Sequence, residues 1–353
     1  MPDERKITAV KNMSSGRSLK ELALHLGLSQ TTVSRVINSS GDTHRISAAT
    51  QKRVLAAAAE MNYKASPLAR GLRSRRSQTI GVMVPEISGG YSAAVLSGIE
   101  DVLLLSGFFY FVVSHHHRAE LLRDYPALLL SRAVEGIIAV DSALDVELPV
   151  PIVAVSGHLR IPSILNIELD HTLAARYALE HLQSLGHRCI AFIKGQSFSS
   201  DTEVRWQSIV KVANELGIAI DSRLVIALEG DDPTLEPGRV ATHKLMAKSI
   251  SFSAIFAFND LSAMGAIVAL REAGLDVPTQ VSVVGFDDVM GASTNNPPLT
   301  TVRQPLQEMG RAAATALLQR IRNQRATEPP CHEPNSILVL PTFVERKSTA
   351  PAP

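Results

Sequence analysis

The sequence predicts an all-α head followed by an α/β body with two lobes and parallel sheets. Short apolar patterns with a helical period occur between residues 18 and 76, whereas apolar runs alternate with helical patterns over the rest. The first 76 residues contain 14 Lys and Arg against 5 Asp and Glu, a formal charge of +9. The remainder contains 21 against 29, a charge of −8. A basic head on an acidic body indicates that the head meets a polyanion, although a solvated basic tail is the alternative.

Composition is typical of a globular protein with two or three domains. The chain has 353 residues, of which 45% are hydrophobic and 20% are charged. Cys189 and Cys331 are too few for a disulfide framework and lack metal-ligand spacing, which suits a reducing cytoplasm. The N-terminus has no apolar signal-peptide core, and no apolar run reaches the roughly 18 residues that a membrane span needs. We therefore expect a cytoplasmic, nucleoid-associated protein with no membrane partner.

Order in the head is expected to begin at Ser18. Residues 1–17 are polar and aperiodic, and we expect them to form a disordered extension. Ser18 can cap a helix with Glu21 at capping-box spacing, Gly27 ends this helix, and Ser29 caps the next. The apolar stripe of the first helix consists of Leu19, Leu22, Ala23 and Leu26.

The second helix has an unusual composition, because half of residues 29–38 are β-branched and such residues are mildly poor helix formers. At 100° per residue, Val33, Val36 and Ile37 share one side and should pack inward. Two short helices joined by a glycine-bearing turn predict a helix-turn-helix, whose second helix enters the major groove of DNA. Its Gln can pair with adenine, its Arg with guanine, and a Thr methyl can contact the thymine methyl. A plain amphipathic pair of core helices is the alternative. The outward side carries Gln30, Thr31, Ser34, Arg35 and Asn38.

The head ends with a third helix and a basic linker. Ser47 is the predicted N-cap of the third helix, whose stripe includes Val54, Ala58 and Met61. The linker over residues 65–77 has space for about two helical turns and should be unstable alone in water.

The linker composition suits a segment that folds on a partner. Pro67 suits the first helical position, whereas Gly71 weakens the helix. Its arginines would contact phosphates, and Leu72 could wedge into a minor groove. A solvated interdomain linker is the alternative. The arginines are Arg70, Arg73, Arg75 and Arg76.

The body alternates apolar runs with helical patterns, which is typical of α/β folds with parallel sheets. Several runs are continuous in Val, Ile and Phe, as strands buried on both faces should be. Eight or more strands predict two lobes, and ligands of such folds bind beyond the carboxyl ends of the strands. Candidate strands lie at 79–85, 108–114, 134–140, 152–156, 189–195, 223–228, 254–258 and 281–286, and helices at 92–107, 172–186, 204–217 and 261–274.

Polar side chains at the predicted strand ends are the candidates for a binding site. The triplet His115 to His117 invites a metal assignment. Successive side chains point in different directions, however, and no Cys or Glu cluster accompanies them, so we expect either a solvated loop or a loop at the rim of the binding site. No metal or cofactor site is predicted, and no nucleophile elbow, P-loop or zinc-protease motif is present. The other candidates are Glu86, Ser88, Asp141, Ser199 to Asp201, Asn259, Asp260, Asp287 and Asp288.

Three side chains among or near these candidates have a structural interpretation. For Asp260 and Asp288, helix capping and loop hydrogen bonds are favoured over ligand binding. Trp206, the single tryptophan, could stack on a sugar ring, but packing on its own helix is favoured.

Long stretches of head and body follow a common pattern. They read "SLKELALHLGLSQTTVSRVINSS", "RISAATQKRVLAAAAEMNYKASPLARGL", "TIGVMVPEIS", "DHTLAARYALEHLQSLGHRCIAFIKG", "AIFAFNDLSAMGAIVALREAGLDVPTQVSVVGFDD" and "PPLTTVRQP". Over about residues 18–349 the sequence resembles the lactose-repressor (LacI/GalR) family of bacterial transcription regulators. The resemblance implies a homodimer on near-palindromic operator DNA, a hinge helix that folds on that DNA, and a core shaped like a periplasmic sugar-binding protein. It also implies a repressor, not an enzyme, controlled by a small sugar-like effector between the lobes.

The resemblance also implies domain boundaries and site residues. The helix-turn-helix domain covers 18–64, the hinge 65–77, the effector-binding and dimerisation domain 78–349, and a short tail 350–353. The effector-contacting Arg, Asn and Asp of the family match Arg205, Asn259 and Asp287, whose types suit hydroxyl-rich or anionic ligands. Ser88 and Tyr91 lie in the first-lobe loop that should contact the ligand. The DNA-contacting positions are Leu19, Ser29, Gln30, Thr31, Thr32, Ser34, Arg35, Asn38, Tyr63, Ser66, Ala69, Leu72 and Arg73.

The sequence departs from the family pattern at three places. About three extra residues precede the third helix, Ala65-Ser66 replaces the usual Pro-Asn, and "SHHHRAE" replaces a more acidic, Asn-rich stretch. One further strand is expected near the C-terminus, where Arg346, Ser348 and Thr349 match the family's usual ending. No leucine heptads follow, so we expect no tetramerising coiled coil.

Two other classes of function fit parts of the sequence. The chain could be a cytoplasmic small-molecule-binding protein without a DNA role, but the basic head and helix-turn-helix argue against this. It could also be a sugar-processing α/β enzyme, but it lacks a catalytic constellation. Whether the effector induces or co-represses stays open.

Overall fold

The chain divides into two compact units, Met1–Ser77 and Gln78–Pro353. The structure is a computed structural model that describes residues 18–37, 46–63, 76–144, 147–324 and 335–353. No helix within these ranges is long and apolar enough to cross a membrane. The predictions for residues 1–17, for the insertion before the third helix and for the hinge segment lie outside the described residues. So do those for Asn38, Ser66, Ala69, Leu72 and Arg73.

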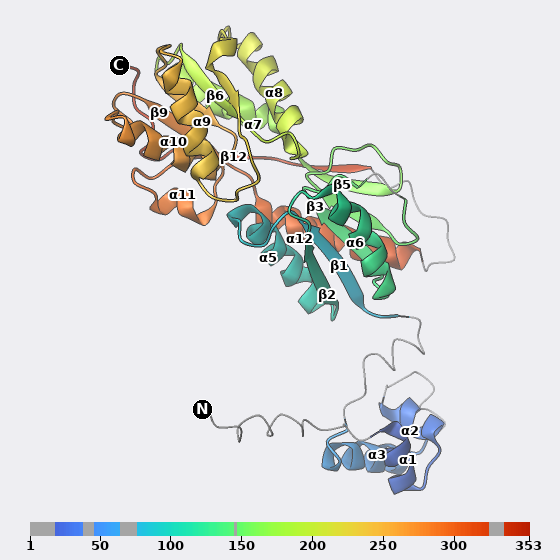
Figure 1. Ribbon diagram of the computed structural model, residues 1–353. Helices are drawn as coiled ribbons and strands as arrows, with labels where there is room; N and C mark the ends of the chain where they lie inside the picture. Colours follow the sequence, from blue (N-terminus) through green and yellow to red (C-terminus); the bar gives the residue numbers. More distant parts are fainter. Residues whose placement is uncertain (1–17, 38–45, 64–75, 145–146, 325–334) are drawn as a thin grey trace, which may run out of the picture. The chain divides into compact units, whose positions relative to one another are not determined.

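Three short helices surround the apolar core of the first unit (Figure 1): α1 (Leu19–Leu26), α2 (Gln30–Ile37) and α3 (Ala48–Glu60). The predicted capping box is confirmed, because the Ser18 hydroxyl accepts from the Glu21 N–H and the Glu21 carboxylate accepts from the Ser18 N–H. Gly27 ends α1 with φ +65, a left-handed conformation that favours glycine. The buried core residues are Leu22, Ala23, Val33, Val36, Val54, Ala57 and Ala58.

The second unit has two lobes, each built on a six-stranded sheet. In the first lobe the strand order is β11-β5-β4-β3-β1-β2, and every neighbouring pair is parallel. In the second lobe the order is β12-β10-β9-β8-β6-β7, parallel except for the antiparallel pair β12–β10. The first sheet contains β1 (Thr79–Val84), β2 (Phe109–Ser114), β3 (Gly136–Val140), β4 (Ile152–Val155), β5 (Ile164–Leu169) and β11 (Ser336–Val339). The second contains β6 (Ile190–Lys194), β7 (Val225–Ala227), β8 (Ala254–Ala257), β9 (Ser282–Asp287), β10 (Thr300–Arg303) and β12 (Thr342–Val344).

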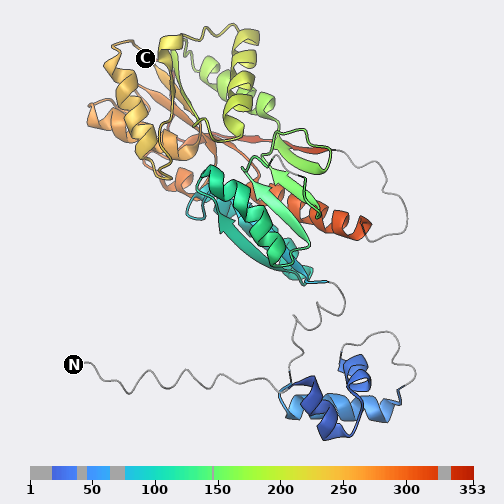
Figure 2. The ribbon, with the colours of Figure 1, turned by 45° about the vertical axis from the view of Figure 1, so that its right-hand side comes forward.

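Helices cover both faces of each sheet, which explains the continuous apolar strands. In the first lobe, α5 and α12 lie side by side on one face and α6 packs on the other (Figures 1 and 2). In the second lobe, α7 and α8 cover one face and α9 and α10 the other. The helices are α5 (Gly90–Leu105), α6 (Ala119–Ser131), α7 (His171–Ser184), α8 (Asp201–Glu215), α9 (Glu236–Ala247), α10 (Asp260–Glu272), α11 (Met290–Thr294) and α12 (Leu306–Asn323), with a 3₁₀ turn at Ser222–Leu224.

The chain crosses between the lobes at three places. The crossings follow β5, β10 and β11, because α7 belongs to the second lobe, α12 to the first and β12 to the second. The expectation of one C-terminal strand was wrong. Leu340 and Pro341 separate two short strands, and a proline cannot donate a ladder hydrogen bond.

All eight predicted strands of the body are confirmed. Several of the predicted strands were expected to be buried on both faces, and the run at 108–114 is not one of them. It forms β2 at the edge of the first sheet, where Phe109 is 62% exposed and Phe111 is 38% exposed. An edge strand lacks a neighbour on one side, so its apolar side chains are left partly uncovered.

Candidate functional site

A cleft lies between the two lobes of the body. It opens beyond the carboxyl ends of strands from both sheets, as expected for an α/β fold. Polar side chains at these ends line the cleft: Glu86 after β1, His116 and His117 after β2, Asp141 after β3, Gln196 after β6, Asn259 after β8, and Asp287 at the end of β9.

Four of the five predicted effector-contacting residues line this cleft: Tyr91, Arg205, Asn259 and Asp287. Ser88 is exposed and does not belong to the described lining, because its hydroxyl turns back to donate to Glu86 Oε2 at 2.9 Å. Its contact with an effector stays a prediction without support from the cleft geometry.

Arg205 is held by protein groups rather than left free as a forked donor. Its Nη2 donates to Asp201 Oδ2 at 2.9 Å, and its Nη1 donates to the carbonyl of Phe258. The guanidinium carbon lies 3.7 Å from the ring centre of Phe286 and 4.4 Å from that of Phe258. Arg205 is 3% exposed, and its Nε has no partner among the described residues. A ligand can therefore reach only part of this donor set.

Asn259 has a structural task as well as a place in the cleft. Its Oδ1 accepts from the Ser262 N–H at 2.9 Å and caps α10, while the Ser262 hydroxyl accepts from the Asn259 N–H. Capping residues of this type satisfy backbone donors that a helix leaves unpaired. The Asn259 amide nitrogen is the group of this side chain that the cap leaves for a ligand.

Burial sets the proton state of two cleft residues. It raises the pKa of Asp287 to about 7, helped by the charges of Asp201 and Asp141 and opposed by Arg205 and Gln304. Burial and nearby carboxylates likewise raise the pKa of Tyr91 well above its usual value, so this phenol stays protonated at neutral pH. Tyr91 shares a 2.8 Å hydrogen bond with Ser156.

Acidic groups outnumber basic ones around the cleft. Arg205 is the one Lys or Arg in the described lining, and Asp201 already pairs with it. The remaining carboxylates would repel a further anion at short range. The acidic lining residues are Glu86, Asp141, Asp201, Asp231, Asp232 and Asp287.

The histidine triplet does not behave as one solvated loop. His116 and His117 line the cleft, as a rim position predicts. His115 is a correction, because it is fully buried and its Nε2 lies 2.8 Å from Ser142 Oγ. Burial and the charges of His117 and His116 lower the pKa of His115 to about 4, so this ring is neutral at neutral pH.

The structural interpretations of the aspartates and the tryptophan largely hold. Asp260 accepts from the Thr301 hydroxyl at 2.6 Å and from the Val289 N–H at 2.8 Å. Asp288 instead forms ion pairs with Arg303 and Arg346.

Trp206 packs on Phe192 with ring centres 5.7 Å apart and is not part of the described cleft lining.

Sequence reasoning missed an aromatic contact in the cleft. His117 and Phe198 stack with ring centres 3.9 Å apart and both line the cleft. Phe198 is 39% exposed. Phe198 follows β6, as Ser199 to Asp201 do. The rule that ligands bind beyond strand ends therefore also predicts a cleft position for this apolar residue.

The second helix of the head presents a small polar surface. Gln30, Thr31 and Arg35 are exposed, whereas Val33 and Val36 are buried as predicted. Ser34 is a correction, because it was expected to face outward and is only 4% exposed. The helix α2 contacts both α1 and α3, so a small side chain at the edge of its apolar face is also covered.

The other predicted DNA contacts in the described part of the head also have structural roles. The Ser29 hydroxyl accepts from the Thr32 N–H at 3.1 Å and shares a 2.8 Å hydrogen bond with the Thr32 hydroxyl. Leu19 and Tyr63 are partly buried against the core of the head. Their contacts with DNA stay predictions.

Comparison with known proteins assigns the chain to a family. Residues 18–66 match the model of bacterial regulatory proteins of the lacI family, and residues 179–349 match that of the periplasmic binding protein-like domain. The HTH-type transcriptional repressor PurR of Yersinia enterocolitica is 31% identical over 350 residues, which cover 95% of this chain and 98% of that protein. The chain belongs to the lacI family of bacterial regulatory proteins.

Solved structures of LacI-family proteins share the fold. The crystal structure of the lac repressor dimer bound to operator and the anti-inducer ONPF is 28% identical, with a TM-score of 0.80, and the match covers 95% of this chain and 99% of that one. A complex of the transcriptional regulator CelR with cellobiose is 28% identical with a TM-score of 0.68, covering 94% and 99%. This LacI-family protein is thus a transcriptional regulator with a helix-turn-helix head and a two-lobed effector-binding body, and its relatives are regulators rather than enzymes.

Proposed function

We propose that the protein represses transcription by binding a near-palindromic operator as a homodimer, and that a small hydroxyl-rich effector in the cleft controls this binding. The observation that carries the proposal is that one chain contains both a candidate DNA-binding surface and a candidate effector site. The head presents Gln30, Thr31 and Arg35 on one exposed helix surface, and the body has a polar cleft between two lobes. We place the protein in the cytoplasm, at the nucleoid, because its proposed operator is there.

Each outward head residue suits a base edge of the major groove. Arg can donate two hydrogen bonds to guanine, Gln can pair with adenine, and a Thr methyl can contact thymine. The two-fold symmetry of a homodimer requires a matching symmetry in the DNA, which gives the near-palindromic operator. The lac repressor relative was crystallised as a dimer bound to operator.

The charge of the cleft narrows the class of effector. An anionic sugar phosphate would have to approach several carboxylates, while the guanidinium of Arg205 is already paired with Asp201. A neutral sugar offers hydroxyl donors to Asp141 and Asp287 without that repulsion. Cellobiose, bound by the CelR relative, is a neutral sugar. We therefore propose a neutral or cationic hydroxyl-rich effector over an anionic one.

Contacts across the cleft give the effector a means of control. Asp141 of the first lobe accepts from the Ser200 N–H at 2.9 Å and from the Ser200 hydroxyl at 2.6 Å, and Ser200 belongs to the second lobe. A ligand that prefers one arrangement of the lobes shifts the population toward it. Reciprocal coupling then requires operator DNA to change the affinity for the effector by the same factor.

The exposed apolar residues of the first lobe suit a dimer contact. Leu104, Leu105, Phe109 and Phe111 are exposed on the end of α5 and on the edge strand β2, which are close in the chain. Exposed apolar patches of this kind are typical of protein interfaces. We propose that a second copy of the chain covers them.

A gel shift combined with a thermal-shift screen tests the proposal. The full chain should retard the DNA upstream of its own gene at concentrations that leave random DNA unbound. The screen compares neutral sugars, amino sugars, sugar phosphates and nucleobases. A hit should raise the melting temperature and change the operator affinity. A hit without specific DNA binding would support a small-molecule-binding protein instead, and turnover of the hit would indicate an enzyme.

A further inference from the structure

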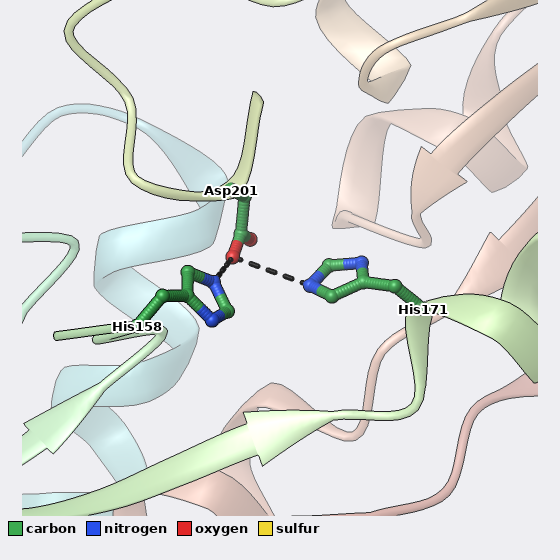
Figure 3. Close-up of side chains that lie close together, drawn as sticks. All are labelled: His158, His171 and Asp201. Atoms are coloured by element: carbon green, nitrogen blue, oxygen red, sulfur yellow. Dashed lines mark hydrogen bonds and ion pairs between the residues drawn. The ribbon is translucent and has the colours of Figure 1, made fainter. Parts of the chain in front are cut away.

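Three side chains converge on one point where the lobes meet (Figure 3). His158 Nε2 lies 2.7 Å from Asp201 Oδ1, and His171 Nε2 lies 3.3 Å from the same oxygen. One ligand atom from each residue lies within 4.8 Å of the other two. His158 follows β4 of the first lobe, whereas His171 and Asp201 begin helices α7 and α8 of the second. The three residues thus join both lobes.

His171 lacks the hydrogen bonds that a buried imidazole normally makes. The residue is 4% exposed, and neither ring nitrogen has a hydrogen-bond partner among the described residues. Its Nε2 is aimed at Asp201 in Figure 3, yet the contact lacks hydrogen-bond geometry. Buried polar groups without partners are uncommon and costly, so this ring indicates a missing partner.

The two oxygens of Asp201 have different partners. Arg205 donates to Oδ2, which leaves Oδ1 for the two histidines. A carboxylate oxygen and an imidazole nitrogen are both groups that bind metal ions.

A carboxylate also lies behind one of the histidines. Glu168 Oε1 is 4.0 Å from His158 Nδ1, on the side of the ring away from Asp201. Histidines that bind metals commonly donate their other ring N–H to a carboxylate. At 4.0 Å the His158–Glu168 contact is longer than a hydrogen bond, so the ring must move toward Glu168 to make one. Arg160 pairs with Glu168 and holds it in place.

We propose that His158, His171 and Asp201 bind one Zn²⁺ ion that connects the two lobes. Two imidazoles and one carboxylate, with a fourth position for water, are a common zinc ligand set. With metal–ligand bonds of about 2.0–2.1 Å, tetrahedral ligand atoms lie about 3.3 Å apart. The His171–Asp201 contact already has this length, and the His158–Asp201 contact must lengthen by about 0.6 Å.

The site goes beyond the effector function proposed above. Asp201 lines the cleft and holds Arg205, so a metal at Oδ1 also fixes the floor of the effector site. Because its ligands come from both lobes, the metal favours the arrangement in which all three ligands meet. Zinc availability then becomes a second input to the same lobe equilibrium.

Metal binding by the full chain tests the proposal directly. Protein stripped with EDTA is titrated with Zn²⁺ against a chromogenic chelator, and Co²⁺ is added to a second sample. We expect one Zn²⁺ per chain, a higher melting temperature with Zn²⁺, and the strong visible bands of tetrahedral Co²⁺. Absence of stoichiometric Zn²⁺ binding, or a weak octahedral Co²⁺ spectrum, would overturn the site.

Single variants identify the ligands. His158→Gln and His171→Gln should each weaken Zn²⁺ binding by at least about 100-fold and remove the Co²⁺ bands. His243→Gln is the matched control, because the His243 side chain is 42% exposed and pairs with Glu272 rather than with the cluster. His117→Gln tests whether the histidine triplet binds the metal instead. This variant should leave the Zn²⁺ affinity unchanged. Wild-type affinity in His171→Gln, or loss in His117→Gln alone, would refute the assignment. If a variant does not fold, the Co²⁺ spectrum of the wild-type protein still tests whether the site exists.

Discussion

Burial makes the charge of Asp287 sensitive to pH near neutrality. Its pKa is about 7 in the folded chain, above the ordinary value of 3.8, first because the side chain is buried and then because Asp201 and Asp141 are close. A raised pKa means that the folded state binds the proton more tightly than the unfolded state does. The resulting stability is present below pH 3.8 and is lost as the pH rises through about 7.

Asp287→Asn should therefore stabilise the protein at high pH. The amide keeps an acceptor for Gln304 but cannot ionise. At pH 8 we expect a higher melting temperature than wild type and an unfolding free energy larger by at most about 4 kcal/mol, whereas at pH 5 the difference should fall to roughly 1.6 kcal/mol. Thermal melts at both pH values measure this. Asp231→Asn, at an exposed cleft carboxylate, is the control. An equal effect of Asp287→Asn at both pH values would contradict the prediction.

Arg35→Ala tests the DNA-facing surface at the level of one side chain. If Arg35 makes a bidentate contact to guanine, the variant should lose about 1–3 kcal/mol of operator binding and relax specificity at one base pair. Gel shifts on operator DNA measure the loss of affinity, and gel shifts on random DNA measure the loss of specificity. Arg53→Ala, on α3, is the matched control within the head. Equal weakening on both DNAs would make Arg35 a phosphate contact.

The sequence predicted which residues line the cleft better than it predicted which of their donors and acceptors are free for a ligand. Strand ends and the family resemblance led to Arg205 and Asn259, and both line the cleft. The sequence did not reveal that Arg205 already donates a hydrogen bond to Asp201, or that Asn259 caps α10. The predicted exposure of Ser34 was wrong for a related reason, because a helical wheel does not show that α1 and α3 both contact α2. Such contacts depend on segments that are distant in the sequence.

At the level of elements, each lobe contains a pair of helices whose backbones approach closely. A Cβ on Gly310 of α12 would lie 2.1 Å from the carbonyl oxygen of Val95, and one on Gly98 of α5 would lie 1.9 Å from that of Gln307. The second lobe repeats the arrangement with α9 and α10. There a Cβ on Gly265 would lie 2.1 Å from the Leu235 carbonyl oxygen. Backbone atoms cannot move aside as a flexible side chain can, so these glycines set the distance between the helices.

Gly310→Ala should separate α12 from α5 and destabilise the first lobe. We expect a loss of about 1–3 kcal/mol or more, typical of overpacking in a dense core. Urea unfolding measures it. Gly291→Ala is the control, because its Cβ would meet only the Met264 side chain, at 3.4 Å and beyond. Equal stability of the two variants would show that the helix pair adjusts without cost.

The strands that the sequence did not predict contain polar residues that the fold buries. In β5, Asn166 is buried with its amide donating to the Leu159 carbonyl, and Glu168 pairs with Arg160. In β10, Thr301 is buried and donates to Asp260. Their partners come from other segments, so an apolar pattern along one strand could not reveal these elements.

At the scale of the whole molecule, the sequence predicted two lobes but not which segments build them. Alternating strands and helices indicate α/β lobes, whereas three crossings send α12 and β11 back to the first lobe after the second has formed. These crossings place residues from distant segments on both sides of one cleft. A change in the angle between the lobes must therefore act on all three connections together.

The proposed dimer gives the last prediction, because it links the edge of a sheet to DNA binding. Phe109→Glu with Phe111→Glu places charges on the exposed edge strand β2, where burying them against a second copy would be costly. We expect a monomer in sedimentation analysis and operator binding weakened at least about tenfold, because each monomer contacts only a half-site. The thermal shift from an effector should persist. Leu338→Glu on β11, at the opposite edge of the same sheet, is the control. A double variant that stays dimeric would place the dimer contact elsewhere.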